Sequence, residues 1–156
     1  MVRVMASGVF DIIHMGHVYY LQEAKKLGDE LVVVVARDST VRKQKHEPIT
    51  PEEMRRELVE SLKPVDRAVL GREGDMFEIV EKIKPDIIAI GYDQPFDIDT
   101  MRAELEKRGL TVDIRKMSHR GGDLDGTRKI VRKVIDMWAF TQKMKQIEGG
   151  GKERRI

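Results

Sequence analysis

The sequence predicts a single α/β domain built on a parallel sheet of five strands. Short runs rich in Val and Ile at residues 2–6, 31–36 and 87–90 are typical of strands buried on both faces. The segments between them have helical spacing, and parallel strands need crossover connections of about a dozen residues. This alternation predicts a doubly wound, Rossmann-like sheet with helices on both faces.

The composition limits what the chain can be. With 156 residues, of which 40% are hydrophobic, it is long enough for one packed domain. The balance of 29 Lys and Arg against 27 Asp and Glu gives no general signal for nucleic-acid binding. No apolar run of membrane-spanning length and no secretory signal occur, so we expect a cytoplasmic protein with no membrane partner. The absence of cysteine excludes disulfides, thiolate zinc sites and a Cys nucleophile.

The first expected helix follows the first strand. Its apolar positions Val18, Leu21, Ala24 and Leu27 lie on one side. Gly28 is expected to end it as the C′ residue.

The next helix is expected to begin at residues 50–53, Thr-Pro-Glu-Glu, which form a capping box with proline at the first helical position. Met54, Leu58 and Leu62 continue an apolar stripe at four-residue intervals. Pro64 marks the end of the segment.

Four further elements follow. Two helices are expected before Pro85 and Gly109, with the apolar positions Phe77, Val80, Ile83, Met101 and Leu105. Residues 112–117 are expected to form the fifth strand. The clearest amphipathic pattern begins after residues 125–127 and runs toward Ile147, with apolar positions Ile130, Val131, Val134, Ile135 and Trp138. We expect the domain to span residues 1–148 and residues 149–156 to form a flexible C-terminal tail.

Ligands of doubly wound sheets bind outside the carboxyl ends of the strands, so the loops there are the place to search. The loop after the first strand contains His14 and His17 with Gly16 between them, next to the unpaired N–H groups of a helix start. Neutral imidazoles donate hydrogen bonds through a ring N–H, and Gly16 lets an anion approach the main chain. These features predict a phosphate site that favours charge growing on phosphoryl oxygens.

Two other interpretations of these histidines are open. They are incidental loop residues, or they form a metal pair. Only Asp11 lies near enough in sequence to be a third ligand, whereas zinc usually has three or four. We therefore assign no protein residue as a metal ligand.

Residues 8–17, Gly-Val-Phe-Asp-Ile-Ile-His-Met-Gly-His, closely resemble the G-[TS]-F-D-x-x-H-x-G-H signature of the cytidylyltransferase-like nucleotidyltransferases. Residues 43–45, 54–56 and 91–94 fall where that family has counterparts. Within the family the chain looks most like the archaeal FAD synthases, with the glycerol-3-phosphate cytidylyltransferases as cousins.

The resemblance implies that a phosphate oxygen of FMN attacks the α-phosphate of ATP, giving FAD and pyrophosphate. Mg²⁺ or another divalent cation is then carried with the triphosphate. It also implies catalytic roles for His14, His17, Lys43 and Arg55. The implied nucleotide-binding residues are Gly8, Val9, Phe10, Asp11, His14, Gly16, His17, Lys45, Gly91, Asp93, Arg120 and Thr127.

Several of these residues have a plainer interpretation. Lys43 and Lys45 belong to a basic run that is typical of solvated surface. Arg55 is equally able to form a surface pair with Glu52. Asp93 is equally a turn residue. For Asp11 we favour a supporting role in the loop over direct metal binding.

The match to the family weakens at two places. Val9 replaces the usual hydroxyl residue. The last signature, usually R-T-x-G-I-S-[ST]-[ST], appears as residues 120–127, Arg-Gly-Gly-Asp-Leu-Asp-Gly-Thr. Asp125 and Gly126 stand there in place of hydroxyl residues, and Asp125 is expected either to face magnesium or to act as a plain N-cap.

The sequence leaves competing functions open. One is transfer of CMP to glycerol 3-phosphate or another small phosphomonoester, and another is a non-catalytic nucleotide-binding regulatory module. A flavin needs a roomy apolar slot, but most of its candidate lining residues are expected in the core: Tyr19, Tyr20, Tyr92, Phe96 and Trp138. The family resemblance also makes a homodimer an expectation.

Overall fold

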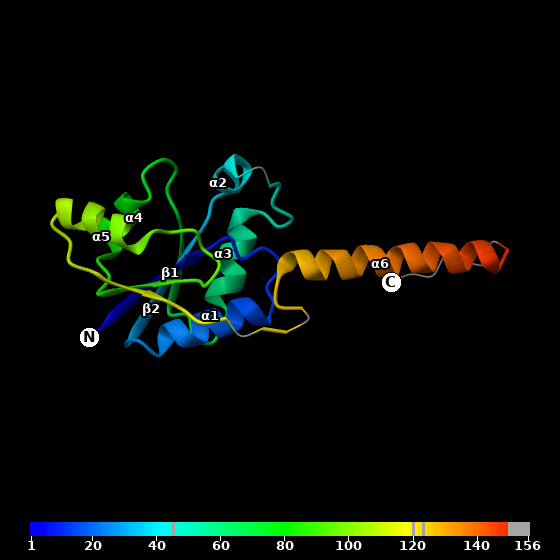
Figure 1. Cartoon of the computed structure of the whole chain (residues 1–156), viewed down its shortest axis with the longest axis horizontal. Helices are drawn as coiled ribbons and strands as arrows, with labels where there is room; N and C mark the ends of the chain where they lie inside the picture. Colours follow the sequence, from blue (N-terminus) through cyan, green and yellow to red (C-terminus); the bar gives the residue numbers. More distant parts are fainter. Residues whose placement is uncertain (45, 120, 123, 150–156) are drawn as a thin grey trace.

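The computed structural model describes residues 1–44, 46–119, 121–122 and 124–149 (Figure 1). Its sheet has five parallel strands in the order β3-β2-β1-β4-β5. The strands are β1 (Arg3–Gly8), β2 (Glu30–Val35), β3 (Arg67–Leu70), β4 (Ile87–Ile90) and β5 (Asp113–Lys116). This order confirms the predicted doubly wound fold. The strand order reverses between β1 and β4, which is the switch point of the sheet.

Helices connect the strands and extend the chain beyond the last one. They are α1 (Met15–Lys25), α2 (Asp38–Lys43), α3 (Glu52–Glu60), α4 (Phe77–Ile83), α5 (Ile98–Lys107) and α6 (Thr127–Ile147). Of these, α2 replaces part of the loop expected after the second strand. The strand β3 has no expected bounds in the sequence, because its four residues include the exposed Arg67.

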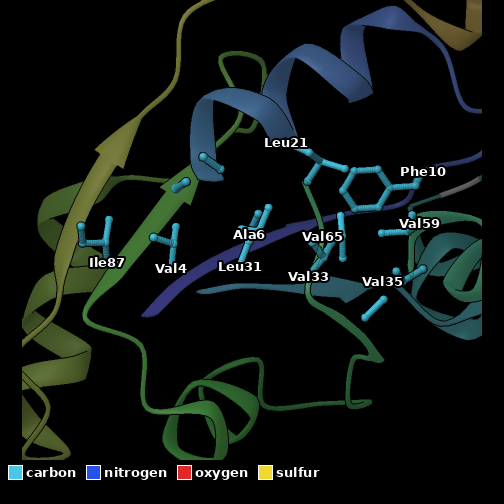
Figure 2. Close-up of a cluster of buried hydrophobic side chains, with 13 residues drawn as sticks. Val4, Ala6, Phe10, Leu21, Leu31, Val33, Val35, Val59, Val65 and Ile87 are labelled. Atoms are coloured by element: carbon cyan, nitrogen blue, oxygen red, sulfur yellow. The ribbon is translucent and has the colours of Figure 1, made fainter. Parts of the chain in front are cut away.

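The core forms two layers, one on each face of the sheet, as expected for helices on both sides. On one face Leu21 and Ala24 of α1 and Val59 of α3 pack on β1 and β2 (Figure 2). On the other, α4 and α5 pack their buried residues on the same strands and on β4 and β5. The sheet is therefore buried on both sides, and its strand ends are left to form a site.

Two features that were expected to mark helix ends, Gly28 and the capping box at residues 50–53, have other roles in the structure. The helix α1 ends at Lys25, and Gly28 lies beyond it, where an added Cβ would come within 2.7 Å of the carbonyl oxygen of Val2. Gly28 thus permits a close approach of two chain segments and is not a C′ stop. The capping box is also absent, because the N-cap of α3 is Pro51 and the Thr50 hydroxyl binds Asp11.

Of the apolar stripe expected at Met54, Leu58 and Leu62, only Leu62, just after α3, packs against the core. Met54 and Leu58 are 48% and 42% exposed, while Arg55 and Val59 are buried. Met54 and Leu58 therefore lie on the surface of the domain.

The last helix, α6, has the bounds that the sequence predicts and projects away from the sheet (Figure 1). None of its 21 residues, all of which the structure describes, is buried. Core packing is expected for most of the five aromatic candidates, and Trp138 and Tyr92 depart from it because they are 57% and 45% exposed. Of the expected tail, residues 150–156 lie outside the described residues. No helix in the described part of the chain is both long and apolar enough to cross a membrane.

Candidate nucleotide site

The two histidines of the first loop lie face to face. The rings of His14 and His17 stack with their centroids 3.7 Å apart, and both side chains remain partly exposed. His14 is the N-cap of α1 and His17 occupies its third position, so a helix start fixes both rings. The spacing in the sequence thus brings together the two imidazoles, as the phosphate hypothesis requires.

Hydrogen bonds fix which nitrogen of each ring carries the proton. Nδ1 of His14 accepts the backbone N–H of Gly16 at 3.0 Å, and Nδ1 of His17 accepts the backbone N–H of His14 at 3.3 Å. A nitrogen that accepts a hydrogen bond carries no proton, so the proton of each neutral ring lies on Nε2. Both imidazoles therefore present an N–H donor on the edge opposite the main chain.

Both rings are held in the neutral form. Burial, together with the neighbouring His14 and against the opposing effect of the Asp11 carboxylate, lowers the pKa of His17 to about 4. Burial also lowers the pKa of His14, against the opposing effect of the Asp125 and Asp93 carboxylates. At neutral pH the pair acts as two dipolar donors and carries no charge.

This pKa shift predicts a loss of stability in acid. The ordinary His pKa is 6.5, so between pH 6.5 and about 4 the unfolded chain binds more protons at His17 than the folded chain. The free energy of unfolding therefore falls as the pH drops through this window. Urea unfolding at pH 7 and pH 5 is expected to show a smaller loss for His17→Asn than for the unmodified chain. Equal losses in the two proteins would contradict this assignment.

The loop before these histidines has an unusual backbone. Phe10 and Ile12 have φ of 55° and 53°, a left-handed conformation that costs non-glycine residues energy. The ring of Phe10 is buried, 5.3 Å from the His17 ring and 6.5 Å from the Tyr20 ring. It lies under the loop and supports the histidines from below.

Asp11 fastens this loop to the segment before α3. Its Oδ2 accepts the Ile49 N–H at 2.7 Å, and its Oδ1 accepts the Thr50 N–H at 3.0 Å and the Thr50 hydroxyl at 2.6 Å. Burial raises the pKa of Asp11, but the hydrogen bonds from Thr50 and Ile49 outweigh it and lower the pKa overall. This geometry supports the expected supporting role.

Arg55 is placed differently from either expectation. It is 0% exposed, and its guanidinium donates to the carbonyl oxygens of Thr50, Val9 and Ala36 at 2.9, 2.8 and 2.7 Å. A fourth bond, at 2.6 Å, joins it to Asp38. The surface pair with Glu52 is wrong, because Glu52 binds Arg37 and the Asp38 N–H instead. Arg55 holds the first loop, the end of β2 and α2 together.

The glycines of the site leave room for the chain itself. A Cβ on Gly16 would lie 2.5 Å from the carbonyl oxygen of Asp125 and 2.8 Å from the His14 ring. A Cβ on Gly8 would lie 3.0 Å from the Phe10 ring. Gly16 thus lets the last loop close on the first, and any contact with a phosphate is additional.

The Asp125 carboxylate of the altered last loop has two side-chain partners. The Asp125 carboxylate bonds to His119 and, at 2.6 Å, to Lys129, and the N-cap of α6 is Gly126. The bond from Lys129 lowers the pKa of Asp125, burial raises it, and the bond to His119 lowers it again. Asp125 is therefore not the N-cap, and the ammonium group of Lys129 offsets its charge.

Thr127 joins the last loop to the first. Its hydroxyl donates to the carbonyl oxygen of Asp11 at 2.7 Å. The start of α6 therefore lies beside the first loop. A contact of Thr127 with phosphate stays a prediction, and Arg120 lies outside the described residues.

The loop after β4 closes the other side. Gln94 accepts the Gly91 N–H at 2.8 Å and donates to the carbonyl oxygen of Ser7 at 3.0 Å, so it bridges the ends of β4 and β1. The role of Gln94 was missed, because a single Gln in a loop carries no distinguishing pattern. Tyr92 stacks on His119 at 3.9 Å, and Asp93 is exposed at the same edge. Their contacts with a nucleotide stay predictions.

The remaining predicted residues lie at the rim. Lys43 is exposed at the end of α2, and its contact with phosphate stays a prediction. Lys45 lies outside the described residues. Val9 contributes its carbonyl oxygen to Arg55. Among residues 1–44, 46–119, 121–122 and 124–149, no three His, Asp or Glu side chains are grouped to hold a metal ion.

Comparisons with known proteins agree with this geometry. Residues 5–149 match the cytidylyltransferase-like family. The FAD synthase of Aciduliprofundum boonei is 61% identical over 137 residues, which cover 87% of this chain and 92% of that protein. The FAD synthase of Methanothermobacter thermautotrophicus is 57% identical over 141 residues, or 88% and 93% of the two chains.

A solved structure gives the same result for the fold. It comes from Thermoplasma volcanium and is described as a lipopolysaccharide core biosynthesis protein, with 56% identity and a TM-score of 0.77. The match covers 78% of this chain and 99% of that one. From the first strand to the end of the last helix, then, the chain belongs to the cytidylyltransferase-like family of nucleotidyltransferases.

Proposed function

We propose that this chain transfers the adenylyl group of ATP to FMN, giving FAD and pyrophosphate. The observation that carries the proposal is the identity of 51–61% to curated FAD synthases over almost the whole chain. The stacked imidazoles at the β1/β4 switch point supply a site whose chemistry fits this reaction.

The reaction needs positioning and charge stabilisation more than a covalent nucleophile. A phosphate oxygen of FMN, already ionised at neutral pH, attacks the α-phosphorus, and the bond from that phosphorus to the bridging oxygen of pyrophosphate breaks. The Nε2–H groups of His14 and His17 donate to the phosphoryl oxygens on which charge grows. The divalent cation enters with the triphosphate as part of the substrate. Lys43 extends from the neighbouring loop toward the phosphates.

The site's support comes from residues that do not touch substrate. Arg55 and Asp11 hold the first loop in its left-handed conformation, and Gln94 holds the two strand ends at a fixed separation. Donors fixed in this way need no reorganisation during the reaction.

The test is a product assay with the full chain, ATP, FMN and Mg²⁺, in which FAD and pyrophosphate are both measured. A parallel reaction contains CTP and glycerol 3-phosphate. FAD formed in equal amount to pyrophosphate is expected, with little turnover in the CTP reaction. Turnover in the CTP reaction alone would assign the chain to polyol phosphates. Nucleotide binding without turnover would make it a regulatory module. A cytoplasmic location stays a prediction.

A further inference from the structure

The helix α6 exposes an apolar face that no other element among the described residues covers. This α6 face consists of Val134, Met137, Trp138 and Met144, all of which are exposed. Trp138 follows Val134 by four residues and Met144 follows Met137 by seven, so the set lies on one side of the helix. Phe140 and Ile147 extend it at one edge. In proteins most of the stability of a helix comes from the packing of its apolar face and not from helix propensity. The face therefore indicates a partner.

The domain to which α6 belongs cannot be that partner. Residues 127–147 contain no Gly or Pro, the residues at which helices bend sharply. With a rise of about 1.5 Å per residue, the helix extends roughly 30 Å from its start, and Figure 1 shows it running away from the sheet. Its apolar residues are out of reach of the other elements of the same copy.

A second exposed apolar surface lies on α3. This α3 stripe consists of Met54 and Leu58, one turn apart, with Ile49 exposed just before the helix. Three carboxylates flank the stripe and share the single guanidinium of Arg56, at 3.2, 3.9 and 3.4 Å: Glu53, Glu57 and Glu60. The surroundings of the stripe are therefore acidic.

The charges of the two surfaces are complementary. The helix α6 carries six Lys and Arg residues against one Asp, whereas three Glu residues line the α3 stripe. We propose that the α6 face of one copy packs on the α3 stripe of a second copy, and reciprocally, in a twofold dimer. An anionic membrane would also bind a basic, apolar helix. It would, however, leave the α3 stripe exposed and would not pair with the carboxylates that flank this stripe. The interface does not depend on the proposed activity.

The test measures molar mass by light scattering on the full chain. The unmodified protein is expected at twice 18.0 kDa. Trp138→Glu on the α6 face and Leu58→Lys on the α3 stripe are each expected to give monomers. Both positions are exposed, so each variant is expected to melt within a few degrees of the unmodified chain. The controls Ala139→Glu, on the opposite side of α6, and Met76→Lys, on an exposed residue at the start of α4, are expected to remain dimers.

Mixing the two monomeric variants gives the sharpest result. In a mixed dimer one of the two contacts is unmodified. In the other, the substituted positions 138 and 58 oppose each other with opposite charges, so the mixture is expected to regain the dimer mass. A monomeric unmodified chain overturns the proposal, whether or not it binds anionic vesicles. A dimer that survives Leu58→Lys, or a mixture that stays monomeric, overturns the pairing of α6 with α3.

Discussion

Replacing His17 with asparagine is expected to lower the turnover of ATP and FMN by roughly 10²–10³-fold, the cost of removing one donor to a developing oxyanion. The oxygen of Asn replaces Nδ1 as the acceptor for the His14 N–H, so the cap of α1 is kept. What is lost is the Nε2–H that faces away from the main chain. The fold is therefore expected to survive while the chemistry does not.

A second substitution at the same position separates the two roles. The side-chain amide of Gln reaches about as far as Nε2, so His17→Gln keeps a donor and loses the capping bond. It is expected to retain more activity than His17→Asn and to unfold at lower urea concentration. Steady-state kinetics and urea unfolding on both variants check this. Higher activity in His17→Asn than in His17→Gln would show that His17 acts through the helix cap and not as a donor.

Replacing Arg55 with leucine is expected to lower the free energy of unfolding by about 3–5 kcal/mol. The change leaves the largely buried Asp38 carboxylate and three carbonyl oxygens without the donor that the fully buried guanidinium supplies. A buried charge that loses its partner costs far more than a surface ion pair contributes. Because the three carbonyls belong to different segments, the site is expected to loosen as well.

Urea unfolding checks this, with Arg56→Leu as a matched control on the same helix. Arg56 forms surface ion pairs with exposed glutamates, so its loss is expected to cost under about 1 kcal/mol. Arg55→Lys keeps the charge and is expected to lie between the two. If Arg55 instead bound phosphate, its loss would raise the KM for ATP and leave unfolding unchanged.

The fold was predictable because the strands β1, β2 and β4 are buried on both faces and therefore have unbroken apolar sequences. The strand β3 is short and begins at an exposed Arg67, so it has no such pattern. The helix α2 has only six residues and no capping side chain, so no pattern in the sequence marks where it begins.

The site was predictable only in part, for a similar reason. A spacing of three residues at a helix start is enough to stack His14 on His17, so a local pattern found them. Arg55 and Gln94 act through partners 46 and 87 positions away, and no local pattern encodes such partners. For Met54 and Leu58 the local pattern gave a wrong prediction. Helical spacing identifies an apolar face but does not show whether the core covers it, and both residues are exposed.

The bond from Thr127 to Asp11 has a consequence for synthesis on the ribosome. It links residues 116 positions apart, whereas the sheet is complete once β5 has formed at residue 116. A nascent chain halted between residues 116 and 127 has every strand but lacks the hydrogen bond from Thr127 to the first loop. Such a chain is expected to fold early and to gain nucleotide affinity late, after α6 has emerged.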